Sequence, residues 1–271
     1  MFKNISKTKK IELLIISAII AAVIIGAAIW VIVDFLLCSQ SDVSIVEKFI
    51  QNFVERDRYS YILQGLSHTL VITVFALIIG LALGTLIALV RTINELRGKL
   101  HFLNAIAKIY LTVIRGTPTM IQLLIIYFVI FAAVDIDKIV IASVAFGLNS
   151  AAYVAEIIRA GINAVPKGQF EAGSSLGLPF RLTMILIILP QAIKNILPAL
   201  CNEGITLMKE TSISGYIGVI DLTKAGNIIS SQTYDAAFPF VGVALIYLVL
   251  VMILTYFVGK LERRLKVSAA V

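Results

Sequence analysis

The amino-acid sequence predicts an all-α polytopic membrane protein with six transmembrane helices. Hydrophobic residues make up 59% of its 271 residues and charged residues only 14%, and the mean hydropathy is +0.99. A soluble domain has about 25% charged residues and could not bury so much apolar surface. The apolar residues also fall in runs of about 20, the length with which a helix crosses a bilayer core of about 30 Å.

Six runs have this character, and four of them are free of charge. The other two carry ionisable residues within the apolar sequence or directly after it, namely Glu156 in one and Lys194 and Glu203 in the other. Because ionisable groups inside a membrane usually face a bundle interior or a water-filled cavity, we expect these two spans to be inner helices. In chain order, the predicted spans are residues 13–33, 69–90, 116–134, 139–155, 182–208 and 236–259.

The first span follows four lysines, as the apolar region of a signal peptide would. A signal peptide has an apolar region of about 7–15 residues ahead of a small-residue cleavage site. Residues 13–33 are longer, and they lead into Asp34-Phe-Leu-Leu-Cys38. The sequence therefore favours an uncleaved anchor helix.

Lysine and arginine are distributed unequally between alternate loops, and this predicts the orientation. The N-terminus, a loop at 91–118, residues 159–194 and the C-terminal tail together hold 17 of the 23 basic residues. Cytoplasmic segments collect Lys and Arg, so both termini are expected in the cytoplasm. The same rule accounts for the net charge of +7, and a nucleic-acid partner is not expected.

The sequence has no pattern typical of catalysis or metal binding. Its two cysteines are far apart without a CxxC motif, and neither of its two histidines has a neighbouring ligand residue. A P-loop is also lacking, because Gly98-Lys99 and Gly259-Lys260 are each followed by Leu. We therefore expect no enzyme activity, no cofactor and no metal, and any ATP that drives the protein must be hydrolysed by a separate subunit.

The stretch between the fourth and fifth spans reads as a helical hairpin. Pro166 suits the first turn of one helix, Gly177 suits a left-handed end to it, and Pro179 suits the start of the next helix. Small residues at 172–175 leave one side flat enough for another protein to dock. A short inter-span connection with a turn would fit these residues equally well.

This stretch resembles the EAA loop of the permeases of ABC importers. The loop has the pattern Glu-Ala-Ala, three residues, Gly, nine residues, Ile, one residue, Leu-Pro. One departure is Gly173, where the family prefers Ala. The matching residues are Glu171, Ala172, Gly177, Ile187, Leu189 and Pro190.

Further segments resemble the polar amino-acid permease family, and the resemblance covers residues 60–265. The family core has five spans, so residues 1–59 would add an anchor helix with its external loop, and residues 266–271 a cytoplasmic tail. The similar segments are Gly65-Leu-Ser-His-Thr-Leu70, Arg115-Gly-Thr-Pro-Thr-Met-Ile-Gln122, Ala152-Tyr-Val-Ala-Glu156-Ile-Ile-Arg159-Ala-Gly161 and Lys209-Glu-Thr-Ser-Ile213.

The resemblance implies a permease that carries a polar amino acid across the cytoplasmic membrane by alternating access, with lipid around it. Two permeases, identical or homologous, would form the pore above two ATPase subunits, and an extracytoplasmic binding protein would deliver the substrate. A coupling hairpin at about 165–182 would dock the ATPase. Its docking residues would be Glu171, Ala172, Gly173, Leu176 and Gly177.

Two acidic residues are candidates for the substrate path. Glu156 could face a substrate amino group, but Arg159 is one helical turn away and a structural ion pair is an alternative. Glu203 lies inside the fifth span beside Asn202, and either a place on the path or structural hydrogen bonding would suit it.

Other polar and small residues in the spans can be explained by contacts between helices as well as by a role in transport. Gln122 and Asn149 are also path candidates, although hydrogen bonds between helices suit both side chains better. Gly80 and Gly84, four residues apart, indicate close packing of two helices.

The alternative function is a self-contained secondary transporter or channel. Glu156 and Glu203 could then couple transport to an ion, but the docking hairpin would have no role. A membrane enzyme would need a nucleophile with its base, paired carboxylates or a metal cluster, and the sequence offers none of these.

Overall fold

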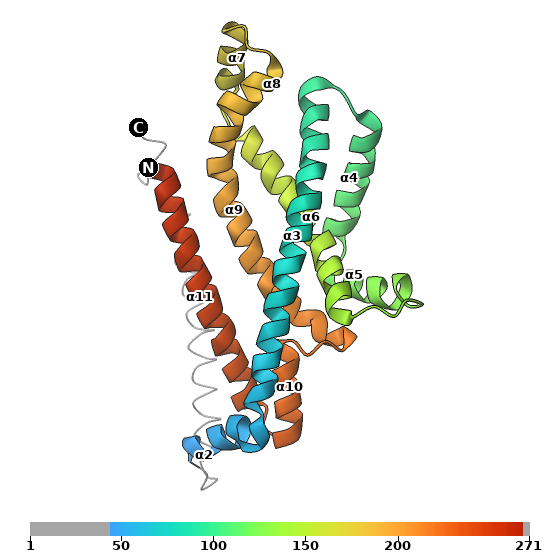
Figure 1. Ribbon diagram of the computed structural model, residues 1–271, viewed down its shortest axis with the longest axis vertical. Coiled ribbons are helices and arrows are strands. Elements are labelled where there is room, and N and C mark those ends of the chain that lie inside the picture. The colour runs from blue at the N-terminus through green and yellow to red at the C-terminus, as the bar shows by residue number, and fades with distance from the viewer. Residues whose placement is uncertain (1–43, 268–271) are drawn as a thin grey trace, which may run out of the picture. The chain divides into compact units, whose positions relative to one another are not determined.

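A computed structural model describes residues 44–267, and all regular elements among them are helices (Figure 1). The predicted anchor helix at 13–33 lies outside the described residues. The chain divides into two compact units, Met1–Ile50 and Gln51–Val271. The short helix α2 (Ile45–Phe49), which Ser44 caps, belongs to the first unit.

The larger unit contains the helices that can cross a membrane. Its first residues, from Gln51, belong to a π-helical turn, η1 (Ile50–Val54). In chain order, the further elements are η2 (Glu55–Asp57), α3 (Tyr59–Arg97), α4 (His101–Gly116), α5 (Thr119–Ile125), η3 (Ile126–Ile130), α6 (Lys138–Asn163), α7 (Lys167–Ser175), α8 (Phe180–Leu182), η4 (Thr183–Ile188), α9 (Leu189–Glu210), η5 (Thr211–Ile217), α10 (Leu222–Thr233) and α11 (Ala237–Val267).

Four helical segments of the described chain are long and apolar enough to span a bilayer. They are 59–97, 138–163, 180–217 and 237–265, and they contain or overlap four of the predicted spans. At 39 residues, α3 extends well beyond the predicted 69–90 at both ends. A bent pair formed by α4 with α5 and η3 is a fifth segment if it counts as one span.

The predicted span at 116–134 is not one continuous helix, and the segment 91–118, which was predicted to be a loop, is mostly helical. Helix α3 continues to Arg97, and α4 ends at Gly116 with Thr117 extended ahead of Pro118. Proline disfavours helical geometry in the residue before it, so the chain turns there by 109°. The 12 residues that follow, Thr119–Ile130, would reach only about 18 Å as a helix.

Helices α3 and α6 form the centre of the unit. Gly80 and Gly84 of α3 face Ser150 and Val154 of α6, and a Cβ added at Gly84 would lie 2.7 Å from the Cβ of Val154. The two backbones can approach this closely only because the α3 positions lack side chains. The predicted close packing at Gly80 and Gly84 is confirmed.

The two predicted inner spans differ in burial. Within this chain, 67% of the apolar window of α6 is buried but only 17% of the corresponding window that includes α9. α6 is therefore an inner helix, as expected. Most of the α9 surface, by contrast, is not covered by other parts of this chain. The reason is that α6 packs mainly against α3 and also against α4, α5 and α9, whereas α9 packs mainly against α6 and α11.

The connections fall at two ends of the unit. The turn between α3 and α4 lies at the same end as α7 and α8, and α10 lies at the other (Figure 1). At the α10 end, buried Asp221 accepts hydrogen bonds from the Lys224 N–H at 2.6 Å and the Ser214 hydroxyl at 3.2 Å. Burial raises the pKa of the Asp221 carboxyl, and these bonds oppose the shift.

Candidate functional site

The predicted hairpin is present as α7, a tight turn and the short helix α8. Pro166 and Pro179 are the residues directly before the two helices, and Gly177 has φ +71°. The Leu178 N–H donates to the Gly173 carbonyl at 3.1 Å, which closes the end of α7. The predicted order of helix, tight turn and helix is therefore present in the structure.

Four of the five predicted docking residues lie on the hairpin surface. Glu171 and Ala172 are exposed, and Leu176 is 75% exposed although it is apolar. A Cβ added at Gly177 would have no atom within 4 Å. Gly173 is instead buried against Thr183. A Cβ added at Gly173 would lie 2.5 Å from Cγ2 of Thr183.

The contact of Gly173 with Thr183 gives a physical reason for the departure from the family pattern. Alanine at 173 would require Thr183 to move, and Thr183 is itself buried at the start of η4. The small residue thus lets α7 lie against the chain that leads into α9. We therefore expect Gly173 to affect docking by fixing the shape of the hairpin and not by contacting the ATPase.

The base of the hairpin is held firmly by α6 and α9. Buried apolar residues form a cluster there, and Phe170 of α7 packs on it. In addition, the Gln191 amide donates to Gln169 Oε1 at 3.2 Å. The buried members of the cluster are Ile162, Val165, Ile188, Ala192 and Ile196.

Glu156 is the centre of an ionic cluster that joins three helices. Its carboxylate pairs with Arg91 of α3, with Arg159 at 2.7 Å, and with Arg115 of α4 at 3.9 Å. Glu95 lies 3.6 Å from both Arg91 and Arg159. The predicted pair with Arg159 is therefore one contact of a larger cluster.

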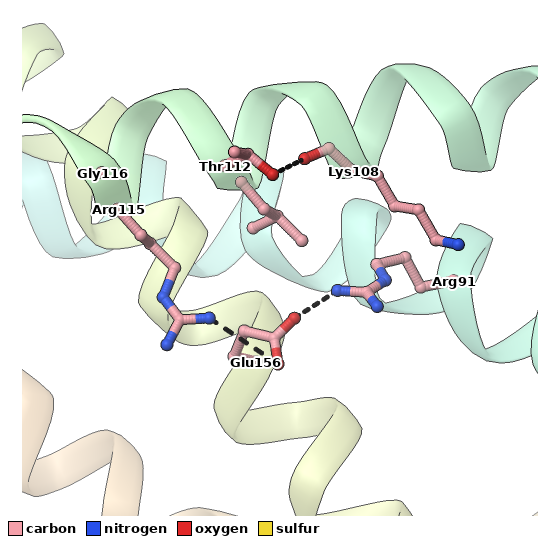
Figure 2. Close-up of a pocket in the computed structure, with 7 residues that line it drawn as sticks. Arg91, Lys108, Thr112, Arg115, Gly116 and Glu156 are labelled. Carbon is pink, nitrogen blue, oxygen red and sulfur yellow. Dashed lines mark hydrogen bonds and ion pairs between the residues drawn. The ribbon is translucent and has the colours of Figure 1, made fainter.

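A pocket of about 460 Å³ opens beside this cluster, between α3, α4 and α6. Figure 2 shows Arg91 and Arg115 pointing to Glu156 from two sides, with the Lys108 side chain extending along the same pocket. Arg91, Lys108 and Arg115 were not predicted as site residues, because they fall in a segment that was predicted to be a loop. Their spacing, with Lys108 and Arg115 seven residues apart, was the available signal for one face of a helix.

Gln122 and Asn149 are occupied in contacts between helices. The Asn149 amide donates to Gln122 Oε1 at 2.9 Å. The Gln122 amide donates in turn to the carbonyl of Ile114 at 2.7 Å and that of Thr117 at 3.0 Å. Gln122 thereby satisfies carbonyls that the end of α4 would leave without a partner.

Glu203 lies half-buried on α9, and its Oε1 accepts a hydrogen bond from the Ser150 hydroxyl of α6 at 2.9 Å. Asn202 beside it is exposed. No Lys or Arg of the described chain lies within 4.0 Å of the Glu203 carboxylate, in contrast to Glu156. Among residues 44–267, no three His, Cys, Asp or Glu side chains come together to hold a metal ion.

The family described as binding-protein-dependent transport system inner membrane component matches residues 80–267, more than two thirds of the chain. The chain belongs to this family. It is a multi-pass membrane component of a transport system, and the predicted polar amino-acid ABC permease family is confirmed.

Curated relatives match most of this permease. It is 44% identical to a putative glutamine transport system permease protein GlnP of Rickettsia bellii, over 77% of this chain and 94% of that one. It is 46% identical to the arginine transport system permease protein ArtQ of Bacillus subtilis, over 76% and 93%. The residues without a counterpart therefore amount to about a quarter of this permease.

Solved structures have the same fold. A chain from the crystal structure of an amino acid ABC transporter with histidines matches with a TM-score of 0.71 and 41% identity, over 78% of this permease and 98% of that chain. A chain of the inward-facing MetNI methionine ABC transporter matches with a TM-score of 0.63 at 21% identity, which shows the fold alone.

Proposed function

We propose that this permease imports a polar amino acid and is driven by ATP hydrolysed in a separate ATPase that docks on the α7–α8 hairpin. The observation that carries the proposal is an exposed apolar residue, Leu176, at the tip of a hairpin whose base is fixed in the helices that cross the membrane. Exposed apolar groups beside a charged residue such as Glu171 are typical of protein contacts.

The cargo is inferred from the relatives, whose names refer to glutamine and arginine. Both are polar amino acids, so we infer a substrate of that class. The relatives do not agree on one amino acid, and the proposal is accordingly for the class.

The hairpin is suited to transmit movement because its two ends continue into two different helices. Val165 at one end follows α6, and Ile188 at the other leads into α9, and both lie in the same buried cluster. A close-packed cluster transmits displacement. A shift of the docked ATPase would therefore tilt α6 and α9 together and change access to the path.

A second permease copy or homologue, a pair of ATPases and an extracytoplasmic binding protein complete the proposed assembly. The open face of α9, with exposed Asn202 and half-buried Glu203, supports the second permease, because polar side chains in a span need a protein or water surface. We place α7 and α8 in the cytoplasm and α10 outside. The anchor at 13–33 would make six spans in total.

Gly177→Arg tests the docking proposal, and Gly98→Arg is its matched control. Both glycines have left-handed backbones, with φ +71° and +59°, and an added Cβ at either has no atom within 4 Å. The backbone strain, about 1–2 kcal/mol, is therefore similar. Gly98 ends α3, outside the hairpin.

We expect Gly177→Arg to reach the membrane but to lose co-purifying ATPase and amino-acid uptake, while Gly98→Arg retains both. The arginine would project from the docking surface into the ATPase. Full ATPase binding and uptake by Gly177→Arg would show that the hairpin is an ordinary connection.

A further inference from the structure

Residues 45–54 form one helical run with an apolar stripe, and they precede residue 80, where the match to the transport family begins. Helix α2 continues into η1 without a break, because Ile50 has φ −60° and ψ −48° and its N–H bonds to carbonyls of α2. Apolar residues recur along the run at spacings of three and four, which places them on one helix face. The stripe consists of Val46, Phe49, Ile50, Phe53 and Val54, and the other face carries Glu47, Lys48, Gln51 and Glu55.

The C-terminal end of this run is fixed to the turn between α10 and α11. The amide of Asn52, which is fully buried, donates to Asp235 Oδ2 at 3.2 Å. The Thr233 hydroxyl donates to Asn52 Oδ1 at 2.9 Å. Just after the run, buried Arg58 donates from Nε to Gln232 Oε1 at 3.2 Å. These bonds give residues 51–58 a defined place beside α10 and α11.

Phe53 indicates the level of this place relative to the membrane. A Cβ added at Gly242 of α11 would lie 2.8 Å from Cζ of Phe53, so the ring lies directly against α11 at that residue. The uncharged part of α11, residues 237–259, is about 34 Å long, and a bilayer core takes about 30 Å of it. Gly242 is about 7 Å from the start of this part, which exceeds the remaining 4 Å or so. Gly242 and the Phe53 ring therefore lie just below the membrane surface.

The rest of the stripe is exposed and joins another exposed apolar surface. Val46 is 63% exposed and Val54 is 50% exposed. On α11, Val241 beside Gly242 is exposed too, and only 11% of the apolar window of this helix is buried within the chain. The stripe is thus continuous, through Phe53, with the face of a helix that crosses the membrane.

Exposed tyrosines lie at the same end of the larger unit. Tyr234 lies between the two residues that bond to Asn52, and it is 96% exposed. Tyr59, at the start of α3, is also exposed. Tyrosine is enriched where a membrane meets water, because its ring is apolar and its hydroxyl is polar. The tyrosines therefore indicate the same boundary as the contact of Phe53 with Gly242.

We propose that residues 45–54 are an interfacial helix, which lies on the membrane surface at the α10 end with its stripe in lipid. Such helices bury their apolar face by about 5–10 Å and keep a charged face in water, which agrees with the level of Phe53. Lipid is the occupant because the stripe continues into the open face of α11. Asn52 and Phe53 hold the helix at this level.

The test places a fluorescent reporter on each face of the run in the full-length protein in nanodiscs. Val54→Cys and Gln51→Cys, both at exposed positions, are made after Cys38→Ser and Cys201→Ser and labelled with bimane. Quenching is measured with a phospholipid that carries a nitroxide high in its acyl chain, and with aqueous iodide. We expect the lipid to quench Val54→Cys several-fold more than Gln51→Cys, and iodide to show the opposite preference.

Two outcomes would overturn the proposal. If iodide quenched both reporters equally, the stripe would face water. If Val54→Cys were shielded from both quenchers, protein would cover the stripe, either the chain that precedes residue 44 or a second copy. Ile50→Cys and Glu47→Cys, also at exposed positions on the two faces, form a second pair to which the same criteria apply if the first pair disturbs folding.

Phe53→Ala tests how the helix is held at the membrane surface. This substitution removes the ring that lies against Gly242, so lipid quenching at Val54→Cys should fall several-fold. Glu55→Gln is the matched control, because Glu55 is exposed on the polar face, and it should leave the quenching unchanged. Equal lipid quenching in the two variants would overturn the role of Phe53 in setting the level of the helix.

Discussion

At the scale of single residues, the charges around Glu156 show what local sequence can predict. The pair with Arg159 is three residues away on one helix, and sequence spacing predicts it. The contacts with Arg91 and Arg115 depend on how α3 and α4 pack on α6. The packing of α3 on α6 depends on close approach at Gly80 and Gly84, which the sequence indicates without giving the register of the two helices.

Glu156→Gln should destabilise the permease by about 1–3 kcal/mol, because three arginines would lose their shared carboxylate. Breaking a fully buried pair costs about 3–5 kcal/mol, and the Glu156 side chain is 20% exposed, so a smaller cost is expected. The measurement is unfolding of the purified protein in detergent.

Glu95→Gln is the control for this substitution. Its carboxylate lies 3.6 Å from Arg91 and Arg159 and is 35% exposed, so the expected cost is below about 1 kcal/mol. If Glu95→Gln lowered the free energy of unfolding as much as Glu156→Gln, Glu156 would not be the main stabilising carboxylate of the cluster.

At the scale of elements, the hairpin was predictable and the bend at Pro118 was not. The hairpin depends on local chemistry, with prolines before two helices and a left-handed Gly177 between them. The uncharged run 116–134 resembles a straight span, and hydropathy does not report where a helix changes direction. Gln122 was expected either on the path or in hydrogen bonds between helices, and its bonds to the carbonyls at the end of α4 were not predicted.

Gln122→Leu should cost about 1–3 kcal/mol, because the carbonyls of Ile114 and Thr117 and the amide of Asn149 would each lose a partner. The matched control is Gln64→Leu on the exposed face of α3, with no cost expected. Equal unfolding free energies for the two variants would mean that the bend does not depend on Gln122.

At the scale of the whole molecule, composition predicted a helical membrane protein, and the orientation inferred from charge asymmetry stays a prediction. Sequence could not predict that α6 is enclosed while α9 stays open within one chain, because both carry ionisable groups in apolar sequence. Their difference arises from packing against α3 and from the surface left for another subunit.

The orientation can be checked with single cysteines in a background without Cys38 and Cys201. Ser231 on α10 and Ser174 on α7 are both exposed. A difference in labelling between cysteines at these two positions would therefore report the side of the membrane on which each lies. An impermeant thiol reagent applied to intact cells should label Ser231→Cys and leave Ser174→Cys unlabelled until the membrane is permeabilised. Labelling of Ser174→Cys in sealed cells would reverse the proposed topology.

We propose that this permease imports an amino acid only through a docked ATPase. The most direct test is uptake of labelled glutamine and arginine into proteoliposomes that contain the permease alone, or the permease with its ATPase and binding protein. We expect uptake only in the complete system and only with ATP. Uptake by the permease alone, driven by an ion gradient, would contradict the claim and favour a secondary transporter.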